Sequence, residues 1–258
     1  MNPFEKIDRL RSMLNNLRPL TVGELERLQE EFMVEYTYNS NAIEGNTLTL
    51  EETALVLQEG VTIDRKPLKD HLEAVGHRDA YRYIVDLVKE KAPLTEHVIK
   101  DIHSLVLMDR PQDKGVYRNV PVRIMGANHI PPQPYAVPLQ MEQLLAEYAG
   151  EMQALHPIAR AALFHLKFEA IHPFIDGNGR TGRLLLNLEL MKEGYPPIDI
   201  KFTDRRRYYD CFHDFHAQNS NPSMLTDLLC AYMEAELQRY ISILSPTLEL
   251  SDEDELEP

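Results

Sequence analysis

The apolar residues of this chain recur every three or four positions along almost its whole length, which is the period of an α-helix. In the first such stretch Phe4, Ile7, Leu10 and Leu14 follow this spacing, and Pro19 ends it. A chain of 258 residues with this pattern is expected to fold as an all-α bundle. The predicted helices lie at about 4–17, 24–43, 49–60, 67–91, 95–107, 136–155, 157–171, 180–193, 203–218 and 222–244.

Residues 115–135, GVYRNVPVRIMGANHIPPQPY, break the helical pattern because they are rich in proline and glycine. Val120, Val122 and Ile124 occupy alternate positions before a turn at 126–128, which predicts a short two-stranded β-hairpin flap. A long irregular loop fits the same pattern equally well. If the strands form, their exposed edge could dock an extended peptide.

The charge of the chain excludes several classes of partner. The net charge is −14, and six of the acids lie in the last ten residues, so the rest of the chain carries −8. Generic binding to nucleic acid or to an anionic membrane needs excess positive charge and is not expected. No run of about 18 apolar residues predicts a membrane span, and the charged start MNPFEKIDRL is unlike a signal peptide. Cys211 and Cys230 lack metal or redox spacing, so we expect reduced core residues in a cytoplasmic protein.

The stretch HPFIDGNGRTGR, residues 172–183, contains two apparent phosphate-binding motifs. GNGRTG fits the G-x-G-x-x-G dinucleotide fingerprint, and GNGRTGR nearly fits the G-x-x-x-x-G-K phosphate loop. Both motifs follow a β-strand, whereas residues 157–171 are predicted to be helical. Arg183 also stands where the phosphate loop needs lysine, and Leu184 where it needs serine or threonine. Both interpretations fail, and a glycine loop between two helices remains.

This loop and the start of the next helix have the properties of an anion site. Gly177 and Gly179 let the backbone turn with its amides exposed, at the N-terminus of a helix that begins near Arg180. Arg180 and Arg183 lie three residues apart, so two guanidiniums could grip a multiply charged phosphate chain. A pair of arginines on a helix is also common on an ordinary solvated face.

Three further side chains of the loop add chemical groups. Asp176 offers a carboxylate to Mg²⁺, which binds one or two carboxylates together with phosphate oxygens. Asn178 could donate to a developing negative charge, and His172 could act as a general base. Each of them alone has an ordinary structural explanation. Their combination within twelve residues favours a catalytic site.

Residues 172–183 resemble the signature of the Fic-domain family, H-x-F-x-[DE]-G-N-G-R-x-x-R, and match every fixed position. The similarity covers roughly 95–235. It implies an all-helical Fic fold with a β-hairpin flap and an enzyme that transfers AMP from MgATP to a hydroxyl of a target protein. It also implies an N-terminal helical region (1–65) and a catalytic core (66–245). The acidic composition of residues 246–258 predicts a disordered tail.

The resemblance also implies a role for each residue of the loop. His172 would deprotonate the accepting hydroxyl, and Asp176 would hold the Mg²⁺. The flap, about 117–135, would present the serine, threonine or tyrosine of a target, or of the enzyme itself. Asn178 and Arg180 are implied to be catalytic together with His172. The residues implied to bind the nucleotide are Asp176, Gly177, Asn178, Gly179, Arg180, Arg183, Tyr208 and Tyr209.

A second short motif, SNAIEG at residues 40–45, closes one of the predicted helices. Ser40 and Glu44 are four residues apart, so the hydroxyl can orient the carboxylate, although a polar pair at a fraying helix end has the same pattern. The stretch resembles the inhibitory motif [ST]-x-x-x-E-[GN] of autoinhibited Fic proteins. The resemblance implies that Glu44 pairs with Arg183 and keeps it from the γ-phosphate. Removal of AMP from the modified target is an alternative second activity that the sequence leaves open.

The pocket for the base is less closely defined. Tyr208 and Tyr209 fall where related proteins place aromatic contacts with the base. His216 stands where the family often has asparagine, with Asn219 three residues on, so ATP rather than UTP or CTP rests on family frequency. Asn187 could support the site or be an ordinary polar residue of its helix.

Three other functions fit parts of the sequence. His165, Glu169 and His172 lie on one helix face, and Glu169-x-x-His172 is half of a di-iron motif, but a second E-x-x-H is missing. Some Fic relatives bind ATP reversed and transfer a phosphoryl group, but they lack the complete G-N-G-R stretch that this chain has. A non-enzymatic helical adaptor would require a broken motif.

Because relatives often form dimers, a homodimer is expected.

Overall fold

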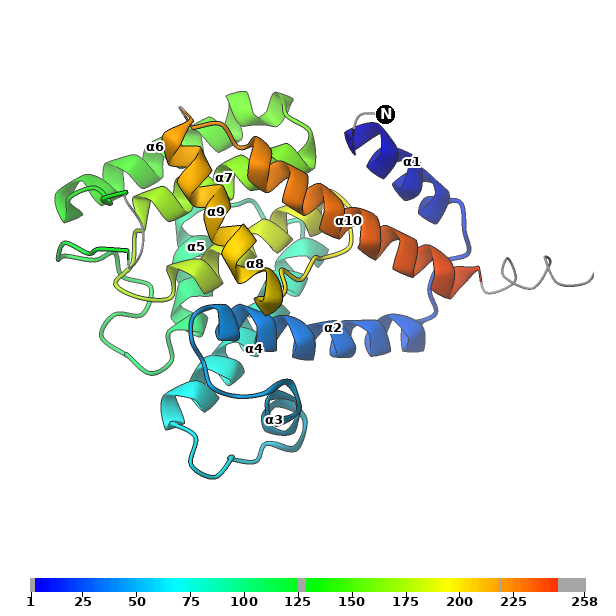
Figure 1. The fold of residues 1–258 in the computed structure, drawn as a ribbon, viewed down its shortest axis with the longest axis horizontal. Helices are drawn as coiled ribbons and strands as arrows, with labels where there is room; N and C mark the ends of the chain where they lie inside the picture. The colour runs from blue at the N-terminus through cyan, green and yellow to red at the C-terminus, as the bar shows by residue number, and fades with distance from the viewer. Residues whose placement is uncertain (1–2, 125–128, 219, 246–258) are drawn as a thin grey trace, which may run out of the picture.

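The structure, a computed structural model, describes residues 3–124, 129–218 and 220–245. All the helical stretches predicted from the apolar spacing are present in it (Figure 1). Two predicted helices are each divided into an α-helix followed by a short π- or 3₁₀-helix. The elements are α1 (Pro3–Asn15), α2 (Val22–Ile43), α3 (Leu50–Ala54), η1 (Leu55–Glu59), α4 (Leu68–Lys89), α5 (Glu96–Val106), η2 (Pro134–Ala136), α6 (Val137–Ala149), η3 (Glu151–Ala154), α7 (Pro157–Ile171), α8 (Asn178–Lys192), η4 (Phe202–Asp204), α9 (Arg205–Ala217) and α10 (Ser223–Leu244).

Side chains close to the helix ends explain where two of these helices begin. The Thr49 side chain accepts from the Glu52 amide, and the Glu52 carboxylate accepts from the Thr49 amide, so this pair forms a capping box at α3. Thr21 and Glu24 form a second one at α2. Each box satisfies two backbone donors that the first turn of a helix leaves free.

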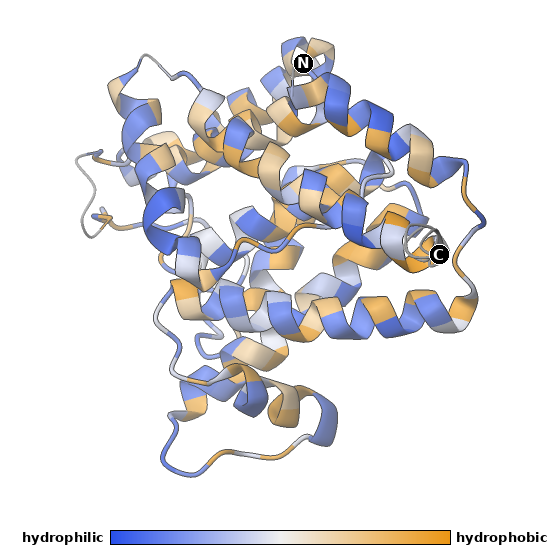
Figure 2. Cartoon of the chain, turned by 45° about the vertical axis from the view of Figure 1, so that its right-hand side comes forward, coloured by the Kyte–Doolittle hydropathy of each residue, from blue (hydrophilic) through white to orange (hydrophobic). Residues whose placement is uncertain are grey.

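The pair α7 and α8 forms the middle of the bundle. Both helices contribute to two hydrophobic clusters, one shared with α4, α5 and α6 and the other with α1, α9 and α10. Figure 2 shows hydrophobic residues along the central helices and many hydrophilic ones on the helices at the outside. Because α7 and α8 are packed on more than one side, both ends of the short loop that joins them are fixed, and Phe174 of the loop belongs to the first cluster.

The C-terminal half of α2 is buried, and it packs against α4 and α8. This packing brings residues 39–43, at the end of α2, next to the loop that begins α8. Helix α1 lies along α10, while α3 and its neighbouring loops project beyond α2 and α4 (Figure 1). The end of α2 is therefore the part of the N-terminal region that reaches the middle of the bundle.

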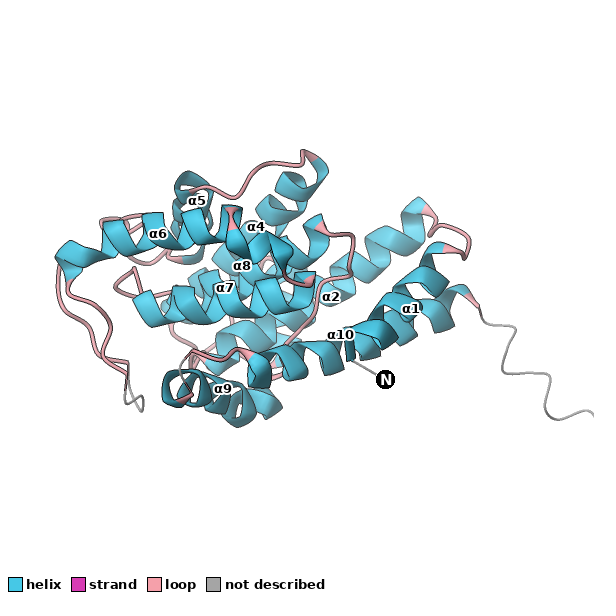
Figure 3. Ribbon diagram, turned by 90° about the horizontal axis from the view of Figure 1, so that it is seen from above, coloured by secondary structure: helices cyan, strands magenta, loops and turns pink. Residues whose placement is uncertain are grey.

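The prediction of a β-hairpin flap is wrong. Residues 115–124 and 129–133 form no strand, and Figure 3 draws the described part of this segment as a loop. The expected turn at 126–128 lies outside the described residues. Prolines account for much of the difference, because they have no N–H to donate to a strand ladder. These prolines are Pro121, Pro131 and Pro132.

Arg118 supplies hydrogen bonds to this segment in place of a ladder. Its guanidinium is buried, and it donates to the carbonyls of Val120 at 3.2 Å and Pro132 at 2.6 Å. It also donates to the carbonyl of His172 at 2.8 Å and to that of Ile171 at 3.4 Å. One buried arginine thus joins both arms of the flap segment (residues 115–135) to the end of α7.

Within the described residues, none of the helices combines the length and the hydrophobicity that crossing a membrane would need. Cys211 and Cys230 are both buried and carry free thiols, as the sequence predicts.

Candidate active site

The loop between α7 and α8 is closed by contacts within itself. His172 ends α7 in a left-handed conformation, with φ at 50°, and Gly177 begins α8 with φ at 76°. The Asn178 side chain accepts from the Phe174 amide and donates to the Phe174 carbonyl, both at 2.9 Å. Phe174 is fully buried and stacks on His103, with ring centroids 3.6 Å apart. The loop is therefore held in one shape by its own side chains.

The contacts of Asn178 bear on its predicted role. Both polar atoms of its side-chain amide are bound to the loop backbone, so the side chain gives the loop its shape. Donation from Asn178 to a phosphate oxygen stays a prediction and would have to share or replace one of these bonds.

Arg183 is held by the end of α2. Its Nη2 donates to Glu44 Oε1 at 2.8 Å and to the carbonyl of Ser40 at 2.8 Å, and its Nε donates to Ser40 Oγ at 3.0 Å. The arginine side chain is only 2% exposed. Burial lowers the pKa of Arg183, but the neighbouring Glu44 carboxylate outweighs this effect and raises the pKa above its usual value. Arg183 is therefore a permanent, buried cation.

Gly179 makes room for this contact. A β-carbon built at position 179 would overlap Glu44 Oε1 and would lie 3.1 Å from Arg183 Nη1. The carboxylate of Glu44 thus lies directly on the backbone of the first turn of α8, where the sequence predicts phosphate oxygens.

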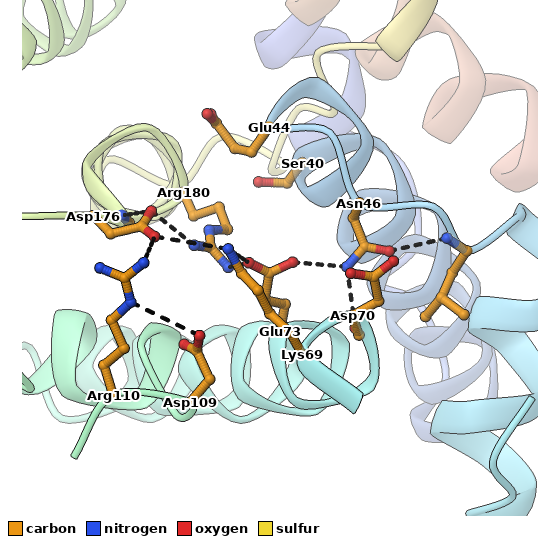
Figure 4. A network of polar contacts seen from close by, with 12 residues as sticks. Ser40, Glu44, Asn46, Lys69, Asp70, Glu73, Asp109, Arg110, Asp176 and Arg180 are labelled. Atoms are coloured by element: carbon orange, nitrogen blue, oxygen red, sulfur yellow. Dashed lines mark hydrogen bonds and ion pairs between the residues drawn. The ribbon is translucent and has the colours of Figure 1, made fainter. Parts of the chain in front are cut away.

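Arg180 faces α4, on another side of the loop (Figure 4). Its Nη1 lies 3.0 Å from Glu73 Oε1, and its Nη2 lies 3.4 Å from Asp176 Oδ1. Arg180 and Glu73 are both buried, with side chains 2% and 7% exposed. Glu73 also accepts from Asn46 Nδ2 at 2.9 Å, which connects this pair to the segment that follows Glu44. A role of Arg180 on phosphate stays a prediction, because the guanidinium is already paired with acids.

Asp176 is surrounded by cations, as Figure 4 also shows. Besides Arg180, Lys69 and Arg110 approach its Oδ2, at 3.8 Å and 3.6 Å. Burial raises the pKa of Asp176, but Arg180, the Gly177 amide and these two cations outweigh it and hold the pKa below its usual range. The residue is therefore a carboxylate with 30% of its side chain exposed.

A magnesium ion fits this arrangement only when phosphate supplies further ligands. Among the described residues, no three His, Cys, Asp or Glu side chains are grouped as they would be to hold a metal ion. Mg²⁺ commonly takes a single carboxylate and completes its coordination with phosphate oxygens and water. Asp176 can supply that carboxylate. The di-iron interpretation of Glu169 and His172 gains no support, because it needs several clustered acids and histidines.

His172 turns one ring nitrogen toward the interior. Its Nδ1 is buried and lies 3.6 Å from Glu169 Oε2. The carbonyl of His172 accepts from Arg118, and its amide donates to the carbonyl of Phe168 at 2.9 Å. The backbone on both sides of the imidazole is therefore fixed.

A cavity of about 450 Å³ opens beside His172, within the range of ordinary ligand pockets. It joins the end of α2, the flap segment, the loop and α9. Its lining combines arginines with aromatic rings, which suits a phosphorylated nucleoside. A hollow of about 640 Å³ between α2 and α4 contains no residue of the loop, so we place the chemistry in the smaller cavity. The residues lining that cavity are Glu44, Arg123, Ile124, His129, Glu169, His172, Gly179, Arg183, Arg205, Tyr208, Tyr209, Phe212, His213 and His216.

The two tyrosines predicted for the base differ in their surroundings. Tyr208 is buried, its hydroxyl lies 2.6 Å from His165 Nε2, and burial raises its pKa well above the usual value. Tyr209 is partly exposed, donates to the Ile43 carbonyl at 3.3 Å and has the Arg205 guanidinium 5.0 Å from its ring centre. Of the two, Tyr209 presents more surface to a base.

The other residues considered for the base are placed as follows. His216 stacks on His129 of the flap segment, with centroids 3.9 Å apart. Asn187 exchanges two hydrogen bonds with the backbone of Ile198, each 2.9 Å, so it supports the chain after α8. Asn219 lies outside the described residues.

The sequence profile of the Fic/DOC family matches residues 93–190. A Fic domain containing signaling protein from Bacteroides thetaiotaomicron superposes with a TM-score of 0.86 at 31% identity, over 93% of this chain and 97% of that one. The chain belongs to the Fic family. The Fic-1 fragment from C. elegans gives a TM-score of 0.84 at 31% identity, over 95% of this chain and 72% of the fragment.

Curated Fic relatives carry the name protein adenylyltransferase Fic. The one from Culex quinquefasciatus is 38% identical over 80% of this chain and 41% of its own length. The one from Nematostella vectensis is 38% identical over 80% of this chain and 48% of its own length. This Fic chain therefore spans less than half the length of the curated relatives it matches.

In this Fic chain the structure brings together Ser40, Glu44, Gly179, Arg183 and His172, as the sequence predicts. It places Arg180 and Asp176 on the α4 side, where three residues that sequence reasoning missed meet them. No local motif could have found these, because they come from α4 and from the loop after α5. They are Lys69, Glu73 and Arg110.

Proposed function

We propose that this chain transfers AMP from MgATP to a hydroxyl side chain of a target protein, and also to itself. The observation that carries the proposal is the cavity where His172, Gly179 and Arg183 meet, because it joins a candidate base, a helix N-terminus and a buried cation. Further support comes from relatives named protein adenylyltransferase, which extend well beyond the region they share with this chain.

In the proposed reaction the hydroxyl oxygen attacks the α-phosphorus, the bond from this phosphorus to the bridging β-oxygen breaks, and pyrophosphate leaves. His172 takes the hydroxyl proton on the ring nitrogen that faces away from Glu169. Arg183, once free of Glu44, balances charge on the phosphate chain. Asp176 would hold a Mg²⁺ ion, which would supply further neutralisation of phosphate charge.

We propose in addition that Glu44 keeps this activity low. The Glu44 carboxylate occupies a donor of Arg183 and lies on Gly179, so its negative charge stands where a phosphate chain would bind. A phosphate must displace the carboxylate or bind out of line for attack. Use of the same glutamate to remove AMP is an open alternative, which hydrolysis of a purified AMP-modified target would test.

The flap segment is the proposed docking surface for the target. Val120 and Ile130 are apolar and 43% and 70% exposed, and His129 of the same segment lines the cavity. An extended target chain lying here brings its hydroxyl toward His172. The homodimer, the cytoplasmic location and a boundary near residue 66 stay predictions.

The function is tested with ATP labelled at either end. The Glu44→Gly variant is incubated with host lysate and with α- or γ-labelled ATP, and the labelled proteins are identified by mass spectrometry. Transfer of the α label alone supports AMP transfer, and transfer of the γ label alone supports the phosphoryl-transfer alternative. Replacing ATP by UTP or CTP tests the base. No transfer of either label would overturn the proposed function.

A catalytic control removes the candidate base, His172, from the loop. His172→Ala in the Glu44→Gly background is expected to reduce labelling by about a hundredfold or more, since a positioned base contributes roughly 10²–10⁴ in rate. Equal labelling with and without His172 contradicts the assignment of the base.

A further inference from the structure

Glu169 is a buried acid that the proposed reaction does not yet use. It lies on α7 one turn before His172 and is only 9% exposed. Its Oε1 has no hydrogen-bond partner within the described residues, and the one ion-pair contact that these residues offer it is His172 Nδ1, 3.6 Å from Oε2. A buried carboxylate without a partner is costly, so this arrangement requires a cation or a donor beside it.

The surroundings of Glu169 fix its position. A β-carbon at Gly182 would come within 2.6 Å of Glu169 Oε1 and within 2.9 Å of the His165 ring. The backbone of α8 thus presses against the carboxylate from one side, while α7 carries it on the other. Glu169 has little freedom to turn away from His172.

The other atom of this contact is His172 Nδ1. It is buried, has no hydrogen-bond partner among the residues described, and belongs to a residue whose backbone is held by Arg118 and Phe168. The separation of 3.6 Å is longer than a hydrogen bond. Catalytic contacts are often long in structures without substrate and shorten when substrate binds.

Accordingly, we propose that Glu169 is a positioning residue that keeps the proton of the neutral imidazole on His172 Nδ1. The lone pair is then on Nε2, the nitrogen directed away from Glu169, where it accepts the proton of the target hydroxyl. After the transfer both ring nitrogens carry protons, and the carboxylate stabilises the resulting cation. This inference rests on the proposed function, in which His172 is the base.

Other charged groups around His172 do not replace Glu169 in this role. The arginines among them can only donate hydrogen bonds. The Glu44 carboxylate is already paired with Arg183. The titratable and charged groups that line the cavity with His172 or contact it are Glu44, Glu169, Arg118, Arg123, His129, Arg183, Arg205, Tyr208, Tyr209, His213 and His216.

The first measurement is the tautomer, which does not depend on activity. ¹⁵N NMR of the ring nitrogens is recorded for the full chain at a pH where the imidazole is neutral, with His172→Ala assigning the signals. We expect Nδ1–H in the parent and mainly Nε2–H in Glu169→Ala, because water favours the Nε2–H form of a free imidazole. An unchanged tautomer in Glu169→Ala overturns the proposal.

The second measurement is kinetic and uses the Glu44→Gly background. Glu169→Ala is expected to lower kcat at least about tenfold while KM for ATP changes by less than about twofold, because the role proposed for Glu169 is to orient the base and not to bind the nucleotide. Glu169→Gln, which keeps the shape and one acceptor, should recover part of the loss. A fall in kcat/KM that lies wholly in KM contradicts a role in positioning the base.

Glu189→Ala is the matched control. Glu189 is also a buried acid, 2% exposed, and its Oε1 has no hydrogen-bond partner among the described residues, but it lies near Arg160, Tyr148 and Lys192 at the other end of α8. It should change stability without changing the His172 tautomer. If no variant transfers AMP, the proposed function fails, yet the tautomer still decides whether Glu169 positions His172.

Discussion

Glu44 Oε1 and Arg183 Nη2 lie 2.8 Å apart, and they join the C-terminal cap of α2 to the second turn of α8. The arginine is buried whereas the glutamate keeps 33% of its side chain exposed, so the contact is open to competition on one side only. A ligand that enters the cavity meets the carboxylate before it meets the guanidinium. This order makes the pair a natural control point for binding of an anion.

Glu44→Gly is expected to raise AMP transfer about a hundredfold or more. Removing one partner of a buried, charge-assisted pair changes the free energy by ~3–5 kcal/mol, and each 1.36 kcal/mol is about tenfold in rate. Initial rates with α-labelled ATP measure the effect. Glu51→Gly changes an exposed acid in the first turn of α3 and serves as the control. Equal rates for wild type and Glu44→Gly would show that the pair does not limit the reaction.

Ser40→Ala is expected to activate the enzyme less than Glu44→Gly does. The substitution removes the hydroxyl that accepts from Arg183 Nε, while the Ser40 carbonyl and Glu44 still bind the guanidinium. Loss of one hydrogen bond to a charged group amounts to about 1.5–3 kcal/mol at most. Rates of AMP transfer rank the variants. A Ser40→Ala rate above that of Glu44→Gly goes against this order.

Glu73→Gln is expected to destabilise the fold by about 3 kcal/mol, because it leaves the buried Arg180 without its closest anion. The free energy of unfolding from urea titration measures the loss. Glu90→Gln, at the exposed end of α4, is the matched control and should change stability by less than about 0.5 kcal/mol. A similar small change for both variants would mean that Asp176 alone satisfies Arg180.

Acid is expected to weaken the fold through buried histidines. Burial lowers the pKa of His103 and His165 to about 4 each. The unfolded chain protonates these imidazoles below about pH 6.5, while the folded chain keeps them neutral. The free energy of unfolding is therefore highest above pH 6.5 and falls as the pH is lowered toward 4. Between pH 7 and pH 5 the loss is on the order of 2 kcal/mol for each histidine.

His103→Gln tests this slope directly. His103 Nδ1 accepts from the Gly115 amide at 3.0 Å, so protonation would remove an acceptor that the fold uses. The variant should unfold with a weaker dependence on pH than wild type, and His97→Gln, which changes a histidine side chain that is 87% exposed, should not. Urea titrations at about pH 7 and pH 5 give the comparison. Parallel slopes in wild type and His103→Gln would contradict the prediction.

The helices could be predicted because their signals are local. The limits of α7 follow from Pro157 at its start and from the proline and glycines beyond Ile171. The flap segment could not be predicted in the same way. Its alternating residues are β-like, but its prolines lack donors, and its carbonyls are satisfied by Arg118 from within a tertiary arrangement that no local pattern records.

The residues of the candidate site also differ in whether the sequence alone could predict their contacts. His172, Gly179 and Arg183 come together because they lie within twelve residues of one loop, and a resemblance supplied Glu44. The partners of Arg180 and Asp176 are far away in sequence, so their pairing with Glu73 and Lys69 appears only after α4 has packed on α8. The spacing of Glu169 and His172 was visible as a shared helix face, yet spacing alone does not say which nitrogen points where.

Position 179 carries a consequence of its own. A single methyl group there would collide with the Glu44 carboxylate, and it would equally obstruct an oxyanion approaching the backbone of the first turn. The resting form and the working form of the protein therefore depend on the same bare α-carbon. Alanine at position 179 would displace the Glu44 carboxylate but would also block phosphate from the same backbone. A substitution at this position therefore cannot relieve the inhibition and keep the activity.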